Sequence, residues 1–211
     1  MAHPRVAYVC VVGSGKPPLK RPKAGRLNGA PDVKILGQWE RLPGPPAEYT
    51  QALASGFMPL APQELRTFFI TAATWGRRPI FRAEPMARLF LDTLQRYRAQ
   101  HKFLLHEFVV MPDHVHLLLT PAPEVPMEKA VQLIKGGSSF RVKKELNSNL
   151  EVWATGYTEH RVKDAADYQK HAAYIRENPV RAKLVETCAA YRFSSASGQW
   201  EIDPTPPWLK P

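Results

Sequence analysis

The sequence has little cysteine: Cys10 and Cys188 are its two cysteines, and they lie far apart along the chain. Two cysteines are too few for a framework of several disulfides, and they suit the reducing cytoplasm. Long apolar runs are also lacking, since no stretch approaches the roughly 20 residues that a membrane-spanning helix needs. The run from Val6 to Val12 is too short and too weakly flanked for a secretory signal. We therefore expect a cytoplasmic protein that has no membrane partner.

Acidic residues are scarce relative to basic ones, with 19 Asp and Glu against 29 Lys and Arg and a pI of about 9.8. This surplus favours a polyanionic partner, nucleic acid before an anionic membrane surface. Gly13-Ser14-Gly15-Lys16 resembles part of a phosphate-binding loop. A Walker motif would need Gly at position 10 and Ser or Thr at position 17, where this chain has Cys10 and Pro17. The composition therefore favours a nucleic-acid partner over a protein that is merely basic, and it does not indicate an NTPase.

Proline and charge divide the chain into three parts. Residues 1–62 are rich in proline, show no sustained hydrophobic period and predict a partly irregular N-terminal extension. Its basic tract between positions 16 and 26 either follows a phosphate backbone or remains a solvated arm. Residues 63–198 carry the regular hydrophobic patterns of a folded domain. Residues 199–211 predict a Pro-rich C-terminal tail that packs loosely.

The folded part predicts an alternation of strands and helices. Runs of β-branched and aromatic residues favour strands, and apolar residues three to four positions apart favour helices. The expected strands lie within 67–74, 103–111, 114–120 and 152–162, and the expected helices within 83–100, 127–146 (interrupted at Gly136-Gly137) and 164–178 (stopped by Pro179). This order predicts an α+β fold, a ferredoxin-like split β-α-β sandwich whose antiparallel sheet has its helices on one face.

One strand of the predicted hairpin carries a His-x-His pattern. His114 and His116 follow a turn at Pro112-Asp113, and because side chains alternate along a strand, both imidazoles point to the same face. Two imidazoles side by side on a rigid strand can hold one metal ion. The alternative is a strand end with two exposed or hydrogen-bonded histidines, and the pattern by itself leaves both interpretations open.

The last predicted helix carries a polar stripe at positions i, i+4, i+7 and i+11, which lie along one side of a helix. The stripe consists of Asp167, His171, Tyr174 and Asn178, and the neighbouring stripe, expected in the core, of Tyr168, Ala172 and Ile175. If the polar stripe faces the two histidines, a phenol and an amide join two imidazoles around one point. The alternative is a buried tyrosine whose hydroxyl is satisfied by a neighbour.

Two motifs together resemble those of a known family. Pro112-Asp113-His114-Val115-His116, followed by Tyr174-Ile175-Arg176-Glu177-Asn178-Pro179-Val180-Arg181-Ala182, resembles the REP-associated tyrosine transposases. These belong to the wider single-tyrosine HUH transposases, where HUH denotes His, a hydrophobic residue and His. The resemblance covers roughly residues 66–195, and further support comes from Phe69-Ile70-Thr71, from Lys135-Gly136 and from Trp153 through His160. Residues 1–62 resemble nothing that we can place.

The resemblance implies a metal-dependent DNA nickase and strand transferase. It implies that His114 and His116 hold a divalent cation, Mg²⁺ or Mn²⁺, which acts as a Lewis acid on the scissile phosphate. Asn178, four residues after the tyrosine, is then a further ligand, where related insertion-sequence enzymes often carry Gln. Tyr174 is then the nucleophile that forms a 5′-phosphotyrosine and frees a 3′-hydroxyl. Because a phenolate is a good leaving group, strand transfer can reverse this bond without ATP.

The implied substrate is single-stranded DNA with hairpins or palindromic repeats. The residues expected to contact it are Arg77, Arg78, Lys135, Arg141, Lys143, Lys144, His160 and His171, with Trp153 or Tyr157 as stacking partners. Two other functions stay open: a non-catalytic nucleic-acid-binding domain of the same fold, and a metal-dependent phosphodiester hydrolase with Asp113 or Glu159 as base. The sequence also leaves open whether a monomer or a homodimer acts.

Overall fold

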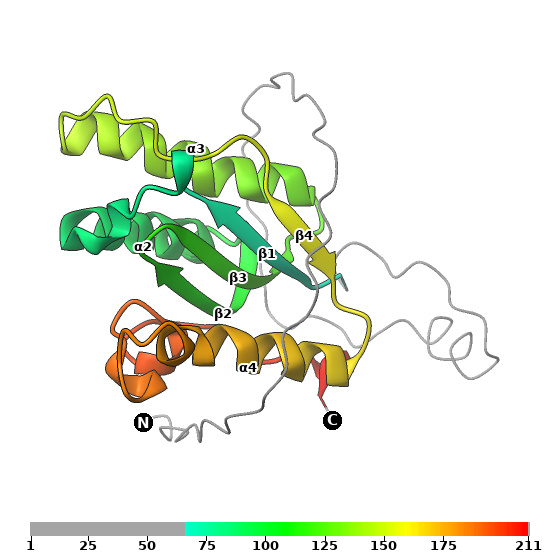
Figure 1. Ribbon diagram of the computed structural model, residues 1–211. Coiled ribbons are helices and arrows are strands. Elements are labelled where there is room, and N and C mark those ends of the chain that lie inside the picture. The colour runs from blue at the N-terminus through cyan, green and yellow to red at the C-terminus, as the bar shows by residue number, and fades with distance from the viewer. Residues whose placement is uncertain (1–65, 211) are drawn as a thin grey trace, which may run out of the picture.

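The computed structural model describes residues 66–210, which form an antiparallel sheet covered by helices (Figure 1). The strands are β1 (Phe68–Ala73), β2 (Phe103–Met111), β3 (His114–Pro121) and β4 (Thr158–Arg161), in the spatial order β2-β3-β1-β4, and the α-helices of this part are α2 (Glu84–Ala99), α3 (Met127–Glu145) and α4 (Ala165–Arg181). This arrangement confirms the predicted α+β fold. No helix within residues 66–210 has the length and apolarity that crossing a membrane requires. The predicted extension, residues 1–62, lies outside the described residues.

The β2–β3 hairpin turns at Pro112-Asp113, as predicted, and the two histidines of β3 point to one face of the sheet. On β3 the alternate residues Val115, Leu117 and Leu119 enter the core on one side, whereas Leu118 enters the core on the other. His114 and His116 share the parity of Leu118 and therefore lie on this second face. The register of β1 against β3 places Thr71 opposite His116.

The helices lie on both faces of the sheet, whereas the sequence predicted them on one face. α2 and α3 pack on the face of Ile70 and Val115, and α4 packs on the face of Phe69 and Leu118 (Figure 1). The physical reason is that the central strands are apolar on both faces, and β2 is buried along nearly its whole length. A strand of that kind needs cover on each side.

Two helices run through residues that were predicted to interrupt or stop them. α3 is continuous across Gly136-Gly137, and a Cβ atom at Gly137 would lie 2.7 Å from the ring of Tyr97 on α2. Gly137 therefore permits close packing of the two helices. α4 continues past Pro179 to Arg181 and buries the proline. Proline has no backbone N–H, and in the last turn of a helix this lack costs a single hydrogen bond.

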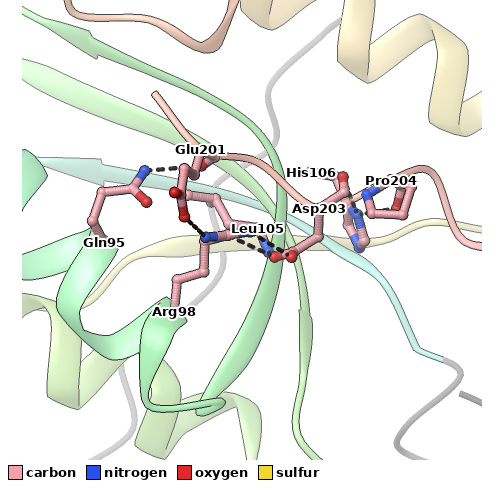
Figure 2. Close-up of polar contacts among 7 residues, drawn as sticks. All are labelled: Gln95, Arg98, Leu105, His106, Glu201, Asp203 and Pro204. Atoms are coloured by element: carbon pink, nitrogen blue, oxygen red, sulfur yellow. Dashed lines mark hydrogen bonds and ion pairs between the residues drawn. The ribbon is translucent and has the colours of Figure 1, made fainter. Parts of the chain in front are cut away.

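The C-terminal segment packs on the sheet, so the prediction of a loosely packed tail is wrong. Figure 2 shows Asp203 against β2: its N–H donates to the carbonyl of Leu105 (2.7 Å), and the Leu105 N–H donates to Asp203 Oδ2 (2.7 Å). Arg98 of α2 donates to both carboxylate oxygens of Asp203, at 3.0 and 2.9 Å. These bonds cover part of the edge of β2, whose backbone groups would otherwise be open to pairing with another chain.

We expect Asp203→Ala to lower the free energy of unfolding by about 2–4 kcal/mol. The change removes the acceptor of the Arg98 guanidinium and of the Leu105 N–H, and both side chains of the ion pair are less than a fifth exposed. Glu201→Ala is the matched control, because Glu201 also accepts from Arg98 (2.7 Å) but is 84% exposed. Glu201→Ala should lower the free energy of unfolding by less than about 1 kcal/mol. Urea unfolding followed by tryptophan fluorescence measures both, and equal losses would contradict the structural role of Asp203.

A buried histidine on β2 predicts a loss of stability in acid. His106 Nδ1–H donates to the carbonyl of Pro204 at 2.9 Å (Figure 2). Its Nε2 therefore accepts from the hydroxyl of Thr120, also at 2.9 Å. Burial lowers the pKa of His106 to about 4, against the smaller opposing effect of Asp203. In the unfolded chain a histidine has a pKa of about 6.5 and takes up its proton first. The contribution of His106 is therefore complete above about pH 6.5 and declines as the pH falls towards 4.

The urea midpoint should therefore decrease between pH 7 and pH 4.5. Histidine NMR signals assign the effect to this residue: the His106 ring should keep its neutral chemical shift down to about pH 5. A His106 signal that titrates near pH 6.5 would contradict the buried neutral state.

Candidate active site

His114, His116 and Tyr174 meet on the face of the sheet that α4 covers. The ring centroids of the two histidines are 4.7 Å apart, and the Tyr174 ring lies 5.2 Å from the His116 ring, edge to face. Strand alternation places the two imidazoles side by side, and the packing of α4 brings the phenol to them. The structure thus joins the three side chains that the sequence predicts as catalytic.

His116 presents one unpaired nitrogen towards this site. Its side chain is 4% exposed, and its Nδ1 lies 2.8 Å from the hydroxyl of Thr71 on β1. Nε2 is buried and has no hydrogen-bond partner among the described residues. Burial lowers the pKa of His116 well below its usual range, and the charges of His114, Arg77 and His171 lower it further. A neutral imidazole whose Nδ1 donates to Thr71 carries its lone pair on Nε2, the form that binds a metal ion.

His114 is oriented by the residue that precedes it. Its Nδ1 lies 2.6 Å from Asp113 Oδ1, so the carboxylate accepts the Nδ1 proton and leaves the lone pair on Nε2. Partial burial raises the pKa of Asp113, but hydrogen bonds from His114 and Arg77 outweigh burial, and the net pKa is lowered. A carboxylate that holds a histidine in one tautomer is the usual support of an imidazole metal ligand.

Tyr174 belongs to a helix that is fixed to the sheet of its own chain. Ile175 is completely buried, and Arg176 Nη1 lies 3.1 Å from Glu107 Oε1 on β2. The Tyr174 ring itself is half-buried, meets the ring of Phe69 edge on at 5.9 Å, and lies 5.6 Å from the guanidinium carbon of Arg181. These contacts hold the phenol beside histidines of the same chain.

Asn178 follows Tyr174 by one helical turn and is buried, at 9% exposure. The helix stays regular through this residue, because α4 ends only at Arg181. The four-residue spacing to Tyr174 is therefore a real helical spacing. The role of the Asn178 amide as a metal ligand stays a prediction.

A second polar group lies on the same face, where β4 meets α4. His160 Nε2 is 2.7 Å from Asp167 Oδ2, and His171 Nε2 is 3.3 Å from Asp167 Oδ1. The ligand atoms of the three side chains all lie within 4.8 Å of one another, so the group could hold a metal ion. The sequence predicted His160 and His171 as DNA contacts, and the structure places both of them around this carboxylate.

Arg77 is the predicted DNA contact that the structure places beside the histidines. Its Nη1 donates to Asp113 Oδ2 at 3.4 Å, and its side chain is 64% exposed. Arg77 has a φ of 55°, which lies in the left-handed region that residues other than glycine seldom adopt. Backbone strain of this kind concentrates at functional sites.

The other predicted contacts are distributed elsewhere. Three are bonded within the fold: Arg78 donates to the carbonyl of Glu151, Lys135 to the carbonyls of Ala154 and Gly156, and Arg141 to the carboxylate of Glu145. Lys143 and Lys144 are exposed at the end of α3, on the opposite side of the sheet from α4. For these two lysines to contact the same DNA that meets Tyr174, the DNA strand would have to wrap around the β-sheet.

Of the two predicted stacking residues, Trp153 is unsuitable. It is 7% exposed and packs against the rings of Phe81 and Phe90, so a DNA base has no access to its face. Trp75, 44% exposed and two residues before Arg77, is an exposed aromatic side chain near the site that sequence reasoning missed. The sequence feature that could have pointed to Trp75 is its position directly after a predicted strand, beside Gly76 and two arginines.

Sequence reasoning also missed two site residues on β1. Thr71 orients His116, and the ring of Phe69 stacks with His116 (5.3 Å) and with His171 (4.4 Å). Their alternation on one strand was visible, but their place opposite the histidines depends on the register of β1 against β3. Because α2 and β2 separate β1 from β3 in the chain, no turn between these two strands fixes their register.

Comparisons with known proteins identify the family of the chain. Residues 66–178 match the family model described as "Transposase IS200 like", a range that contains both histidines, Tyr174 and Asn178. The chain is 23% identical over 160 residues to the REP-associated tyrosine transposase of Escherichia coli K12, which covers 66% of this chain and 89% of that protein. A solved structure of a REP-associated tyrosine transposase bound to a REP hairpin has a similar fold, with a TM-score of 0.51 and 24% identity over 66% of this chain and 85% of that one.

Proposed function

Because the chain belongs to the IS200-like transposase family, we propose that it cleaves and rejoins single-stranded DNA through a covalent bond to Tyr174. The observation that carries this proposal is the phenol beside two histidines, 5.2 Å from the ring of His116, whose Nε2 is buried without a partner within residues 66–210. A nucleophile next to a place for a cation suits attack on a phosphodiester. The alternatives, a DNA-binding domain without catalysis or a hydrolase that uses water, give the Tyr174 phenol no role.

His114 and His116 fit a divalent cation. His114 Nδ1 lies within hydrogen-bond distance of the Asp113 carboxylate, and His116 Nδ1 within that distance of the Thr71 hydroxyl. Each ring therefore keeps an Nε2 lone pair for the ion. Asn178 would add an amide oxygen from α4. We infer Mg²⁺ or Mn²⁺, which accept such oxygen ligands and keep open positions for water and phosphate. When bound, the ion supplies Lewis acidity that neutralises charge on the scissile phosphate.

In the proposed reaction the Tyr174 oxygen attacks the phosphorus in line with the leaving 3′ oxygen. The phenol gives up its proton, the bond between phosphorus and the 3′ oxygen breaks, and that oxygen gains a proton to become a 3′-hydroxyl. The DNA is then held as a 5′-phosphotyrosine. Attack of a 3′-hydroxyl on this phosphotyrosine restores the phosphodiester and the phenol, so that each cycle conserves the bond energy. Arg181, whose guanidinium lies beside the Tyr174 ring, is placed to attract the phosphate.

The proposed substrate is hairpin-forming repeat DNA with a single-stranded flank. The REP hairpin in the related solved structure and the net charge of +10 of this chain support this choice. Arg77, which contacts Asp113, supplies an exposed guanidinium, and Trp75, two residues earlier, supplies an exposed indole. This is the combination that binds a phosphate and stacks a base of a single strand. We propose that Tyr174 serves the histidines of its own chain, because Ile175 and Arg176 fix α4 to the same sheet.

The test uses the full chain and a labelled oligonucleotide that contains a palindromic repeat of the host with single-stranded flanks. We expect cleavage at one position in a flank with Mg²⁺ or Mn²⁺, and none with EDTA. The control is the same oligonucleotide with both flanks annealed to complementary strands, which should resist cleavage. Tight binding of several such hairpins without cleavage would support the DNA-binding alternative. Cleavage that leaves both DNA ends free of protein would support the hydrolase.

A further inference from the structure

We propose that His160, Asp167 and His171 form a second metal site, separate from His114 and His116, that binds Zn²⁺ or a similar transition-metal ion and links β4 to α4. The group does not contain the three residues to which we assign the reaction. Metal binding at this place therefore does not depend on the proposed DNA chemistry.

Of the two distances from Asp167 to the histidines, one matches the spacing of ligand atoms around a bound ion and the other is a shorter hydrogen bond. Asp167 Oδ2 is 2.7 Å from His160 Nε2, Asp167 Oδ1 is 3.3 Å from His171 Nε2, and the two imidazole centroids are 4.7 Å apart. In a tetrahedral zinc site with bonds of about 2.0–2.2 Å, neighbouring ligand atoms lie about 3.4 Å apart. Small rotations of the three side chains would open the group to this separation.

The fold holds each ligand on a rigid element. His160 lies on β4 opposite Phe69, and His171 stacks on the Phe69 ring at 4.4 Å. Asp167 lies in the first turn of α4, where its N–H donates to the capping carboxylate of Asp164 (2.8 Å) and its Oδ2 accepts from the Lys163 N–H (3.1 Å). An ion would therefore meet ligands whose backbone positions are already fixed, which reduces the entropy lost on binding.

The group is accessible and has suitable protonation states. The exposed fractions of the three side chains are 38% for His160, 17% for Asp167 and 14% for His171, so an ion and a water molecule can reach them. Burial lowers the pKa of His171, which favours its neutral form. Partial burial raises the pKa of Asp167, but hydrogen bonds from His160 and Lys163 lower it more, so it is ionised. Neutral imidazole and ionised carboxylate are the forms that bind metal.

The ligand set selects the class of ion. Two imidazoles with one carboxylate suit a transition-metal ion such as Zn²⁺, Co²⁺ or Ni²⁺. Three protein ligands leave one tetrahedral position for water. The site would fix the first turns of α4 to the sheet edge, and Tyr174 follows His171 by three residues on that helix. The Phe69 ring, which stacks on both His171 and His116, lies between the two groups of histidines.

The experiment measures zinc bound to tag-free full-length protein by mass spectrometry of the metal after equilibrium dialysis. The four samples are the unchanged chain, His160→Gln/His171→Gln, His114→Ala/His116→Ala, and the variant with all four substitutions. We expect two ions in the unchanged chain, one in each double variant and none in the fourfold variant. Equal zinc content in the unchanged chain and His160→Gln/His171→Gln would overturn the proposal, as would loss of all zinc in His114→Ala/His116→Ala.

A second measurement separates ion binding from misfolding. In His114→Ala/His116→Ala, zinc at about 100 times its dissociation constant should raise Tm by about 5–10 °C, because the site exists only in the folded chain. Asp167→Asn in the same background keeps the side-chain size, and it should weaken zinc binding at least about tenfold while the circular dichroism spectrum is unchanged. Unchanged zinc affinity in a folded Asp167→Asn variant would also overturn the proposal.

Discussion

Tyr174→Phe is expected to abolish the covalent protein–DNA adduct and to reduce DNA cleavage at least about 10³-fold, the scale on which loss of a covalent nucleophile acts. The change removes one oxygen and keeps the ring, so the edge contacts with His116 and Phe69 persist. The fold and the affinity for the hairpin should therefore stay close to those of the unchanged chain. Denaturing electrophoresis of labelled DNA measures the adduct, and a filter-binding assay measures the affinity.

Tyr168→Phe is the matched control for this prediction. Tyr168 lies on the same helix, but it is buried, and its hydroxyl accepts from Thr205 Oγ1 at 3.3 Å on the side of the helix that packs in the core. Loss of this hydroxyl should lower the free energy of unfolding modestly and leave the protein–DNA adduct in place. An adduct that persists in Tyr174→Phe would show that another group is the nucleophile.

Replacing either strand histidine with alanine is expected to reduce metal-dependent cleavage by about 10²–10⁴-fold, because one of few ligands to the ion is lost. His114→Ala should behave like His116→Ala, since the two rings lie 4.7 Å apart and each has its Nδ1 bonded to an oxygen, which leaves Nε2 for the ion. Cleavage measured over a range of Mn²⁺ concentrations should show a weaker apparent metal affinity. The double variant should bind hairpin DNA and leave it uncut.

The control for the histidine variants is His101→Asn. His101 is exposed in the connection between α2 and β2 and has a φ of 53°, a conformation that Asn also tolerates. We expect cleavage and its metal dependence to be unchanged in this variant. Full cleavage by His114→Ala/His116→Ala would contradict the assignment of the cation to these two histidines.

Much of the fold follows from local patterns. The strands, the helices and the turn at Pro112-Asp113 were predictable because hydrophobic period and turn residues are local properties of the chain. The family inferred from two motifs is confirmed by the match over residues 66–178. The placement of α4 on the second face was not predicted, although the nearly continuous apolar run of β2 was a signal that both faces are covered.

The C-terminal segment shows why other parts escape prediction. Asp203 bonds to Leu105 and Arg98, about a hundred positions earlier, and its own neighbourhood is polar and rich in proline. Such a sequence is typical of a tail, and the partners that order it are visible only in three dimensions. The same holds for Gly137, which suggests a helix break in sequence and serves a close helix contact in the fold.

In the candidate site, too, the features that follow from local patterns were predictable and the contacts between elements were not. The shared face of His114 and His116 and the stripe of Tyr174 and Asn178 follow from the periods of a strand and a helix. The support residues do not: Thr71 lies opposite His116 only through the register of β1, and the side chains around Asp167 come from β4 and α4. Contacts between elements were therefore the part that required the structure.

The most direct test of the proposed reaction is the chemical identity of the DNA linkage. A hairpin substrate whose leaving fragment is short enough to diffuse away should trap the covalent state, and trypsin should then release residues 171–176, the segment between Lys170 and Arg176 that carries Tyr174. We expect mass spectrometry to find this peptide joined to the 5′ phosphate of the DNA, in reactions with Mg²⁺ or Mn²⁺ and not with EDTA. Cleaved DNA without a modified peptide, or DNA joined to a residue other than Tyr174, would contradict the proposed function.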